Sequence, residues 1–297
     1  MDEEGLTYVN GYDDPPIVAG AGTIGMEIIE DVPDVDAVAV PVGGAGLIAG
    51  VACAIKTLRP ECKVRGFISS MLTSFGLGPY IPLNCQVIGV EAEFCPSYTA
   101  ALKAGKPVPV PVQNTLADGL AVPVVGPHAF EVARHYVDEC VLVNEKQISL
   151  AVLRLIENEK IVVEGGGCSG LAALLPGSTL DRADLKGKNI VVPLCGGNID
   201  TTVLGRVLER GLAADCRLSS FYCTVSDRPG GIANLAALLS ELGASIKDIY
   251  HERAWLYTSV DQVKVKCVVE LNGKEHGEKV RAALTAKGYD FLWEHRS

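Results

Sequence analysis

The glycine-rich run at residues 41–50 is the part of the sequence best suited to bind an anion. It reads Pro-Val-Gly-Gly-Ala-Gly-Leu-Ile-Ala-Gly and follows Val38–Val40, an apolar run that predicts a buried parallel strand. Leu47–Leu58 is apolar, with Lys56 near its end, and predicts a helix. Glycines let a ligand approach the backbone, while the free N–H groups and dipole of a helix start attract a phosphate. The run fits neither common nucleotide-binding pattern, so it favours a phosphate on a different cofactor; a tight turn without a ligand is the alternative.

Strand-like and helix-like segments alternate through the first two thirds of the chain. Apolar runs predict strands at residues 35–42, 87–91, 140–143, 161–164 and 190–194. Helices are predicted at residues 26–30, 47–58, 130–136, 148–157, 169–175 and 201–210. This alternation predicts a mainly parallel sheet with helices on its faces, which binds ligands at the carboxyl ends of its strands. Glycine clusters follow Val42, Glu164 and Leu194, so we expect all three clusters to border one crevice.

The pattern changes near residue 212. Strands are predicted at residues 217–224, 245–252, 262–271 and 289–293, and helices at residues 232–242 and 277–286. The order βαββαβ is typical of a ferredoxin-like module. We therefore expect two domains, residues 1–211 and residues 212–297.

Residues 65–86 do not fit the alternation of the first domain. In an α/β fold, the chain usually passes from a helix to the next strand within about 2–6 residues. Here the chain instead continues through a long apolar segment in which Arg65 is the only charged residue. An exposed apolar loop of this length is unusual on a soluble domain. We interpret residues 65–86 as an atypical insertion: either a lid or interface, or a foreign stretch such as a translated intron.

The composition is that of a folded acidic protein. The 297 residues are 48% hydrophobic and 21% charged, with a formal net charge of −10. No basic stripe is present, which argues against nucleic acid as a partner. We find neither an apolar run of membrane-spanning length nor a signal-peptide pattern. The ten cysteines and five histidines are scattered, so we expect reduced thiols, a cytoplasmic location and no zinc site.

Several motifs, taken in order, resemble the serine/threonine dehydratases of the type II pyridoxal-phosphate fold, a family that includes threonine ammonia-lyases and serine racemases. They are Asp13-Asp14-Pro15, the stretches 20–25 and 41–50, Gly89-Val90-Glu91, Thr115–Gly119, Val163-Glu164-Gly165 and Cys195–Asn198. The C-terminal module resembles an ACT domain, an amino-acid-sensing module, through its turn Asp227–Gly231. The resemblance implies an α/β fold: an incomplete type II parallel sheet with flanking helices, followed by a ferredoxin-like βαββαβ ACT domain. It also implies pyridoxal 5'-phosphate as the cofactor.

The resemblance also implies roles for individual residues. The cofactor phosphate would be bound by Gly43, Gly44, Ala45, Gly46 and Leu47. The family usually has four consecutive glycines here, so Ala45 is a mild departure. Gly119 and Glu164 would line the pyridine ring, and Cys195 would face the ring nitrogen as a neutral thiol. For Cys195 the alternative is a thiol packed in the core, and for Glu164 it is a carboxylate that caps the following helix.

The activity implied by the resemblance is deamination of L-threonine to 2-oxobutanoate, or of L-serine to pyruvate, with release of ammonia. The family's Schiff-base lysine lies in a Ser-Phe-Lys-x-Arg-Gly context, and none of the lysines in this sequence has that context. We therefore expect no catalytic residue in this chain, which we interpret as the C-terminal portion of a dehydratase and as inactive alone. The alternative is a non-catalytic, ACT-containing regulator or paralogous amino-acid-binding protein. Racemisation is a third, weaker hypothesis.

Three further expectations concern metal, effector and assembly. Some family members bind a cation through the glutamate of Gly-Val-Glu, but Phe94-Cys95-Pro96-Ser97 replaces the acidic run expected after Glu91, so we predict no metal. An amino-acid effector would bind at the start of the helix that follows the turn, at Asp227, Pro229, Gly230 and Gly231. A plain capped turn with Asp227 as N-cap is the alternative. The exposed edges of the small sheet favour pairing with a second copy of the chain.

Overall fold

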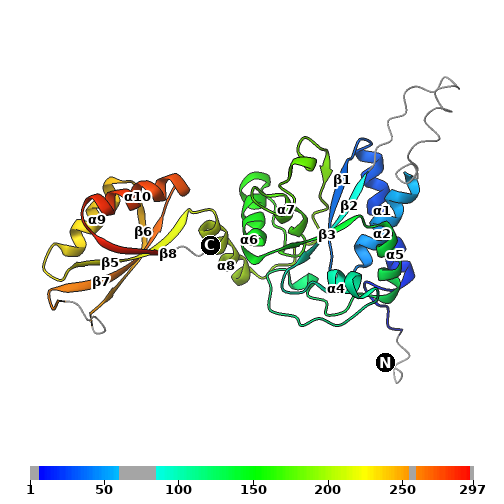
Figure 1. Cartoon of the computed structure of the whole chain (residues 1–297), viewed down its shortest axis with the longest axis horizontal. Helices are drawn as coiled ribbons and strands as arrows, with labels where there is room; N and C mark the ends of the chain where they lie inside the picture. Colours follow the sequence, from blue (N-terminus) through cyan, green and yellow to red (C-terminus); the bar gives the residue numbers. More distant parts are fainter. Residues whose placement is uncertain (1–6, 60–84, 254–258, 295–297) are drawn as a thin grey trace. The chain divides into compact units, whose positions relative to one another are not determined.

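The computed structural model of the chain describes residues 7–59, 85–253 and 259–294 (Figure 1). They form two compact units, unit 1 (Met1–Leu204) and unit 2 (Gly205–Ser297), which are described separately. The predicted boundary between residues 211 and 212 lies inside helix α8 (Thr201–Ala214), and its position stays a prediction. Within the described ranges, no helix combines the length and the apolar character that a membrane span requires.

Unit 1 contains a four-stranded parallel sheet in the order β3-β2-β1-β4. Its strands are β1 (Ala37–Pro41), β2 (Gln86–Ala92), β3 (Glu139–Val143) and β4 (Ile190–Val191). Every residue of β1 is buried, as the unbroken apolar run predicted for a strand covered on both faces. The predicted parallel α/β sheet is therefore confirmed.

Two of the predicted strands differ from the structure. Residues 161–164 form no strand: the side chains of Ile161 and Val162 are exposed, so they have no sheet neighbours to pack against. The predicted strand at residues 190–194 is limited to Ile190–Val191. Pro193 lies just beyond it and has no N–H group to continue the ladder.

Helices cover both faces of this sheet. Figure 1 shows α1 (Pro15–Asp31), α2 (Gly46–Leu58) and α5 (Pro127–Tyr136) on one side, and α6 (Glu145–Arg154) and α7 (Ser169–Leu174) on the other. A π-helical turn, Leu155–Glu159, continues α6. Unit 1 also contains helix α4 (Ser97–Ala104) and two 3-10 turns, Asp118–Leu120 and Ala183–Leu185.

Helix α1 begins 11 residues before the predicted start at Met26, because two of its three glycines, Gly22 and Gly25, lie against the backbone of α2. A Cβ atom at Gly50 of α2 would lie 2.2 Å from the carbonyl oxygen of Val18, and one at Gly25 of α1 would lie 2.7 Å from that of Val51. The two helix backbones therefore touch directly at these glycines. This packing places the start of α2, and with it the glycine run, at the edge of the sheet.

The last residue of the predicted insertion at residues 65–86 is the first residue of β2, and the insertion itself stays a prediction. Residues 65–84 lie outside the described residues, but Cys85 is buried and Gln86 is the first residue of β2, paired with Ala37 of β1. Lys56, which is buried in the last turn of α2, fixes this start of β2. Its Nζ donates hydrogen bonds to the carbonyl oxygen of Cys85 (2.9 Å) and to Oδ2 of Asp138 (2.7 Å).

Unit 2 has the predicted βαββαβ order. After α8 come β5 (Leu218–Ser226), α9 (Gly231–Glu241), β6 (Ser245–Glu252), β7 (Gln262–Glu270), α10 (Lys274–Ala286) and β8 (Asp290–Glu294). The strands form an antiparallel sheet in the order β6-β7-β5-β8, with α9 and α10 on one face (Figure 1). The inward-facing residues of β5 and β7, among them Phe221, Cys223 and Val265, alternate along each strand. They form the core together with residues of both helices, such as Leu235 of α9 and Leu284 of α10.

Candidate functional site

The three glycine clusters that the sequence singled out border one cavity in unit 1. Its volume is about 370 Å³. Each cluster contributes lining residues: Gly43, Gly44 and Gly46 after β1; Gly166 and Gly167 before α7; and Cys195 after β4. Ala45, Leu47, Gly119 and Glu164 also line it, so all eight predicted cofactor-binding residues meet here. Seven of the described residues that line the cavity are glycines, whose backbone is open to a ligand held by N–H groups.

Residues 43–46, called here the glycine loop, lead directly into α2. The first N–H groups of a helix have no acceptor inside the helix, and the helix dipole adds partial positive charge. No residue with a charged side chain lies within the loop, so its chemistry is that of a backbone anion cradle. The loop therefore fits the phosphate of the expected cofactor in charge.

Ala45 is more than a mild departure from glycine. It is the N-cap residue of α2 and has φ 73° and ψ −3°, a left-handed conformation that glycine adopts without strain. For alanine this conformation costs roughly 1–2 kcal/mol. Ala45 is also buried, so its methyl group recovers about 0.8 kcal/mol through burial.

We expect Ala45→Gly to change the free energy of unfolding by less than about 1 kcal/mol. Relief of strain is offset by the lost methyl burial and by roughly 0.5–1 kcal/mol of added chain entropy in the unfolded state. Ala45→Val should instead be strongly destabilising, because a β-branched residue rarely adopts positive φ. Urea unfolding of the three proteins measures both differences. A large stabilisation by glycine would show that the strain is not offset.

The Glu164 side chain lies between two of the loops that form the cavity. Its Oε2 accepts a hydrogen bond from the backbone N–H of Asn198 at 3.1 Å. A Cβ atom at Gly119 would lie 3.4 Å from Oε1, and one at Gly196 would lie 2.7 Å from it. The alternative that Glu164 caps the following helix is wrong, because the N-cap of α7 is Cys168 and no side chain caps it. The carboxylate is therefore placed for a ligand or for loop positioning.

Cys195 is half-buried at the cavity wall rather than packed in the core. Its Sγ donates a weak hydrogen bond to the carbonyl oxygen of Pro193 at 3.7 Å. Burial, and then the negative charge of Glu164, raise the pKa of the Cys195 thiol. This shift favours the neutral thiol, which is the form that the resemblance implies.

Gly11, Tyr12 and Leu120 also line the cavity. Tyr12 and Gly11 line it from the segment before α1, and Leu120 lines it beside Gly119. None of the three is predicted from the sequence to belong to the site. The signal available for Tyr12 was its place directly before the Asp13-Asp14-Pro15 motif.

Glu91 lies away from the cavity, buried at the start of α4. Its carboxylate accepts hydrogen bonds from the backbone N–H groups of Tyr98 (2.6 Å) and Thr99 (2.9 Å) and from the Thr99 hydroxyl (2.6 Å). Burial raises the pKa of Glu91, and these hydrogen bonds oppose that rise. Glu91 thus caps a helix, and the described residues include no cluster of three or more metal-ligating side chains. The absence of a metal from the protein stays a prediction.

Proteins of known function are similar to nearly the whole chain. An L-threonine ammonia-lyase of Thermotoga maritima is 38% identical over 290 residues, which cover 98% of this chain and 65% of that protein. An L-threonine ammonia-lyase of Geobacter sulfurreducens is 39% identical over 289 residues, with 97% and 65% coverage. The chain therefore spans about two thirds of the length of these relatives.

A solved structure of a threonine deaminase is similar to part of the chain. The processed form of threonine deaminase isoform 2 from Solanum lycopersicum is 32% identical, with a TM-score of 0.59, over 70% of this chain and 54% of that one. The family of pyridoxal-phosphate dependent enzymes matches residues 1–196, which include the glycine loop and every predicted cofactor-binding residue. The chain therefore belongs to the pyridoxal-phosphate dependent enzyme family, and its cofactor is pyridoxal 5'-phosphate.

Proposed function

We propose that the chain supplies the phosphate cradle and ring-facing wall of a pyridoxal-phosphate dependent L-threonine/L-serine ammonia-lyase. The reaction would give 2-oxobutanoate or pyruvate, and ammonia. The observation that carries this proposal is the cavity itself, where the glycine loop, Glu164 and Cys195 border one space. The ammonia-lyases of Thermotoga and Geobacter add to it as relatives of similar sequence.

Each of these residues has a distinct task in the proposal. The N–H groups at Gly43–Leu47 bind the cofactor phosphate, because no basic side chain of the loop does so. Bound pyridoxal 5'-phosphate supplies the electron sink that stabilises negative charge at the substrate α-carbon. Cys195 keeps its proton and presents a neutral thiol, and Gly119 leaves room beside the Glu164 carboxylate.

We further propose that these 297 residues are inactive alone. No lysine is among the described residues that line the cavity, and the sequence contains no Ser-Phe-Lys-x-Arg-Gly motif. Without a lysine poised at the cofactor, no group of the cavity can attach the cofactor and move the substrate proton. The chain would then bind the cofactor without turnover.

Titration of the full chain with pyridoxamine 5'-phosphate tests this function, because this compound carries the phosphate but cannot condense with a lysine. Pyridoxamine, which lacks the phosphate, is the matched control. We expect saturable binding of the phosphate form only, followed by intrinsic ligand fluorescence, and no 2-oxobutanoate from L-threonine. Absence of binding, or equal binding of both compounds, would contradict the cradle. Turnover would contradict the proposed inactivity.

A non-catalytic regulator is the second candidate function, and unit 2 favours it. There the turn Asp227–Gly231 joins β5 to α9. The N-cap of α9 is Gly230, with φ 99°, so the alternative with Asp227 as N-cap is wrong. The Asp227 carboxylate instead accepts hydrogen bonds from Arg253 (Nε 2.9 Å, Nη2 2.8 Å), which lower its pKa. Gly231 is needed because a Cβ there would lie 1.9 Å from the Ser226 carbonyl oxygen.

We propose that this turn makes unit 2 an ACT-type amino-acid sensor. An effector's carboxylate would bind at the start of α9, beside the exposed residues Pro229 and Gly230. Its ammonium group would pair with the Asp227 carboxylate. A second copy of the chain would cover the exposed sheet edges, β6 and β8, which makes the protein a homo-oligomer. Sedimentation at increasing protein concentration tests the assembly; a monomer at every concentration would contradict it.

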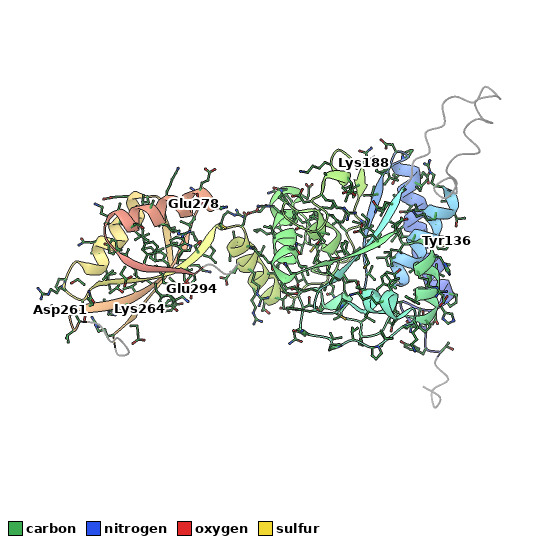
Figure 2. The ribbon with its side chains drawn as sticks, viewed as in Figure 1. Tyr136, Lys188, Asp261, Lys264, Glu278 and Glu294 are labelled. Carbon is green, nitrogen blue, oxygen red and sulfur yellow. The ribbon has the colours of Figure 1, made fainter. Side chains whose placement is uncertain are left out.

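We expect Asp227→Asn to remove amino-acid-dependent shifts in the melting temperature of the chain while it keeps its fold. The substitution preserves shape and removes the charge that would hold the effector's ammonium group. Asp261→Asn is the matched control, because Asp261, labelled in Figure 2, also forms an ion pair, with Arg228 at 2.7 Å. Its carbonyl oxygen accepts a hydrogen bond from the N–H of Asp227 at 2.7 Å, so the two carboxylates are neighbours. Thermal unfolding with the common amino acids is the measurement. Equal shifts in both variants and the parent would contradict the site.

A further inference from the structure

The aromatic ring of Tyr12 lies directly against the glycine loop. A Cβ atom at Gly44 would lie 2.3 Å from both Cγ and Cδ2 of Tyr12 and 2.9 Å from Cδ1. Such distances are far below van der Waals contact, so the ring occupies the space that any side chain at residue 44 would need. The carbonyl oxygen of Tyr12 does the same at Gly46, where a Cβ atom would lie 2.1 Å away. One residue therefore covers two of the three glycines of the loop.

Tyr12 is itself held in place by hydrogen bonds on both sides. Its N–H donates to Oδ1 of Asn10 at 3.0 Å. The next residue, Asp13, is buried and accepts a hydrogen bond from the N–H of Ala129 at 2.9 Å, in the first turn of α5.

The start of α5 is also hydrogen-bonded to the glycine loop, so the loop, the segment before α1 and α5 are all linked to one another. The N–H of Gly126, the N-cap residue of α5, donates to the carbonyl oxygen of Gly44 at 3.0 Å. Gly126 also lies against Asp13, since a Cβ there would be 2.1 Å from Oδ1 of that residue. Gly44, Tyr12, Asp13 and Gly126 thus fix one another without any ligand.

We propose that Tyr12 is a positioning residue that holds the glycine loop in its phosphate-binding shape. This inference rests on the proposed function of the cavity as the cofactor site. The ring covers one side of the loop, so the backbone N–H groups are ordered before the ligand arrives and the entropy cost of binding falls. The requirement for glycine at residue 44 is then set by the ring, in addition to the ligand.

A double-mutant cycle in the full chain tests this role, with Tyr12→Ala, Gly44→Ala and the double variant. The probe is pyridoxamine 5'-phosphate. We expect Tyr12→Ala to weaken its binding about tenfold and Gly44→Ala to weaken it more, while the double variant binds better than Gly44→Ala alone. Tyr12→Phe should bind like the parent, because it keeps the ring. Tyr8→Ala is the control, since Tyr8 is exposed on the same segment.

Unchanged binding by Tyr12→Ala, or strictly additive effects in the cycle, would overturn the role of Tyr12. Loss of binding in Tyr12→Phe would move the role from the ring to the hydroxyl group and would also overturn it. Urea unfolding of the parent chain and the three variants of the cycle makes the test independent of the proposed function. If the parent chain does not bind the probe, the proposed function fails, and coupling between residues 12 and 44 in stability still decides whether Tyr12 fixes the loop.

Discussion

Replacing Gly44 by aspartate is expected to abolish binding of the cofactor phosphate, with a loss of affinity of at least about 100-fold. The substitution puts a negative charge on the loop whose N–H groups would receive the phosphate. It also forces a side chain into the space of the Tyr12 ring, only 2.3 Å from the position of the new Cβ atom. Titration with pyridoxamine 5'-phosphate measures the loss.

Gly44→Asn separates the two causes, because asparagine has the shape of aspartate without its charge. We expect the asparagine variant to bind weakly and the aspartate variant to bind about tenfold more weakly still. Thermal unfolding of both variants shows whether the rest of unit 1 stays folded. Unchanged binding in the aspartate variant would rule out the glycine loop as the phosphate cradle.

Gly50→Leu is expected to unfold unit 1, at a cost of at least about 4 kcal/mol. Helices α1 and α2 meet through their backbones here, and a Cβ atom at Gly50 would lie 2.2 Å from the Val18 carbonyl oxygen and 2.7 Å from the N atom of Gly22. These are backbone atoms that no rotamer change can move, so the helices must separate. Far-UV circular dichroism during urea unfolding measures the effect.

Gly20→Ala is the matched control for this prediction. Gly20 also lies in α1, but a Cβ atom there would meet nothing within 4 Å. We expect a gain of up to about 1 kcal/mol, because alanine favours the helix. The sequence has no tryptophan within residues 1–204, so tryptophan fluorescence does not report on unit 1 and circular dichroism is used instead. A stable Gly50→Leu variant would contradict the close packing of α1 and α2.

The sequence predicted those parts of the fold whose pattern is local. The buried strands β1, β2 and β3 are short apolar runs, and their alternation with helices specified the parallel sheet. Helix α4 was missed because it is short and its start depends on Glu91, which lies six residues before Ser97 in the chain. The first half of α1 was missed because glycine is a poor helix former unless another backbone lies against it.

The site was predicted to the extent that it consists of glycine clusters at strand ends. All eight predicted cofactor-binding residues line the cavity, whereas their roles toward the cofactor stay predictions. Tyr12 could not be assigned, because its contact with Gly44 joins segments 32 residues apart and depends on the position of α5. The strain at Ala45 was also hidden, since only the backbone angles reveal it.

The glycine-lined wall of the cavity has a consequence for genetic variation. A cradle made of main chain offers no side chain that selection can exchange for a similar one. In a saturation mutagenesis screen of a complete enzyme, Gly44, Gly46 and Gly167 should therefore reject every substitution, whether polar, apolar or charged, because a Cβ atom would lie 2.3, 2.1 and 1.7 Å from its nearest neighbours. Cys195 and Glu164 should tolerate replacements of matching chemistry. The screen should thus show two kinds of constraint around a single cofactor. The glycines exclude any side chain whatever its chemistry, whereas Cys195 and Glu164 require a side chain of matching chemistry.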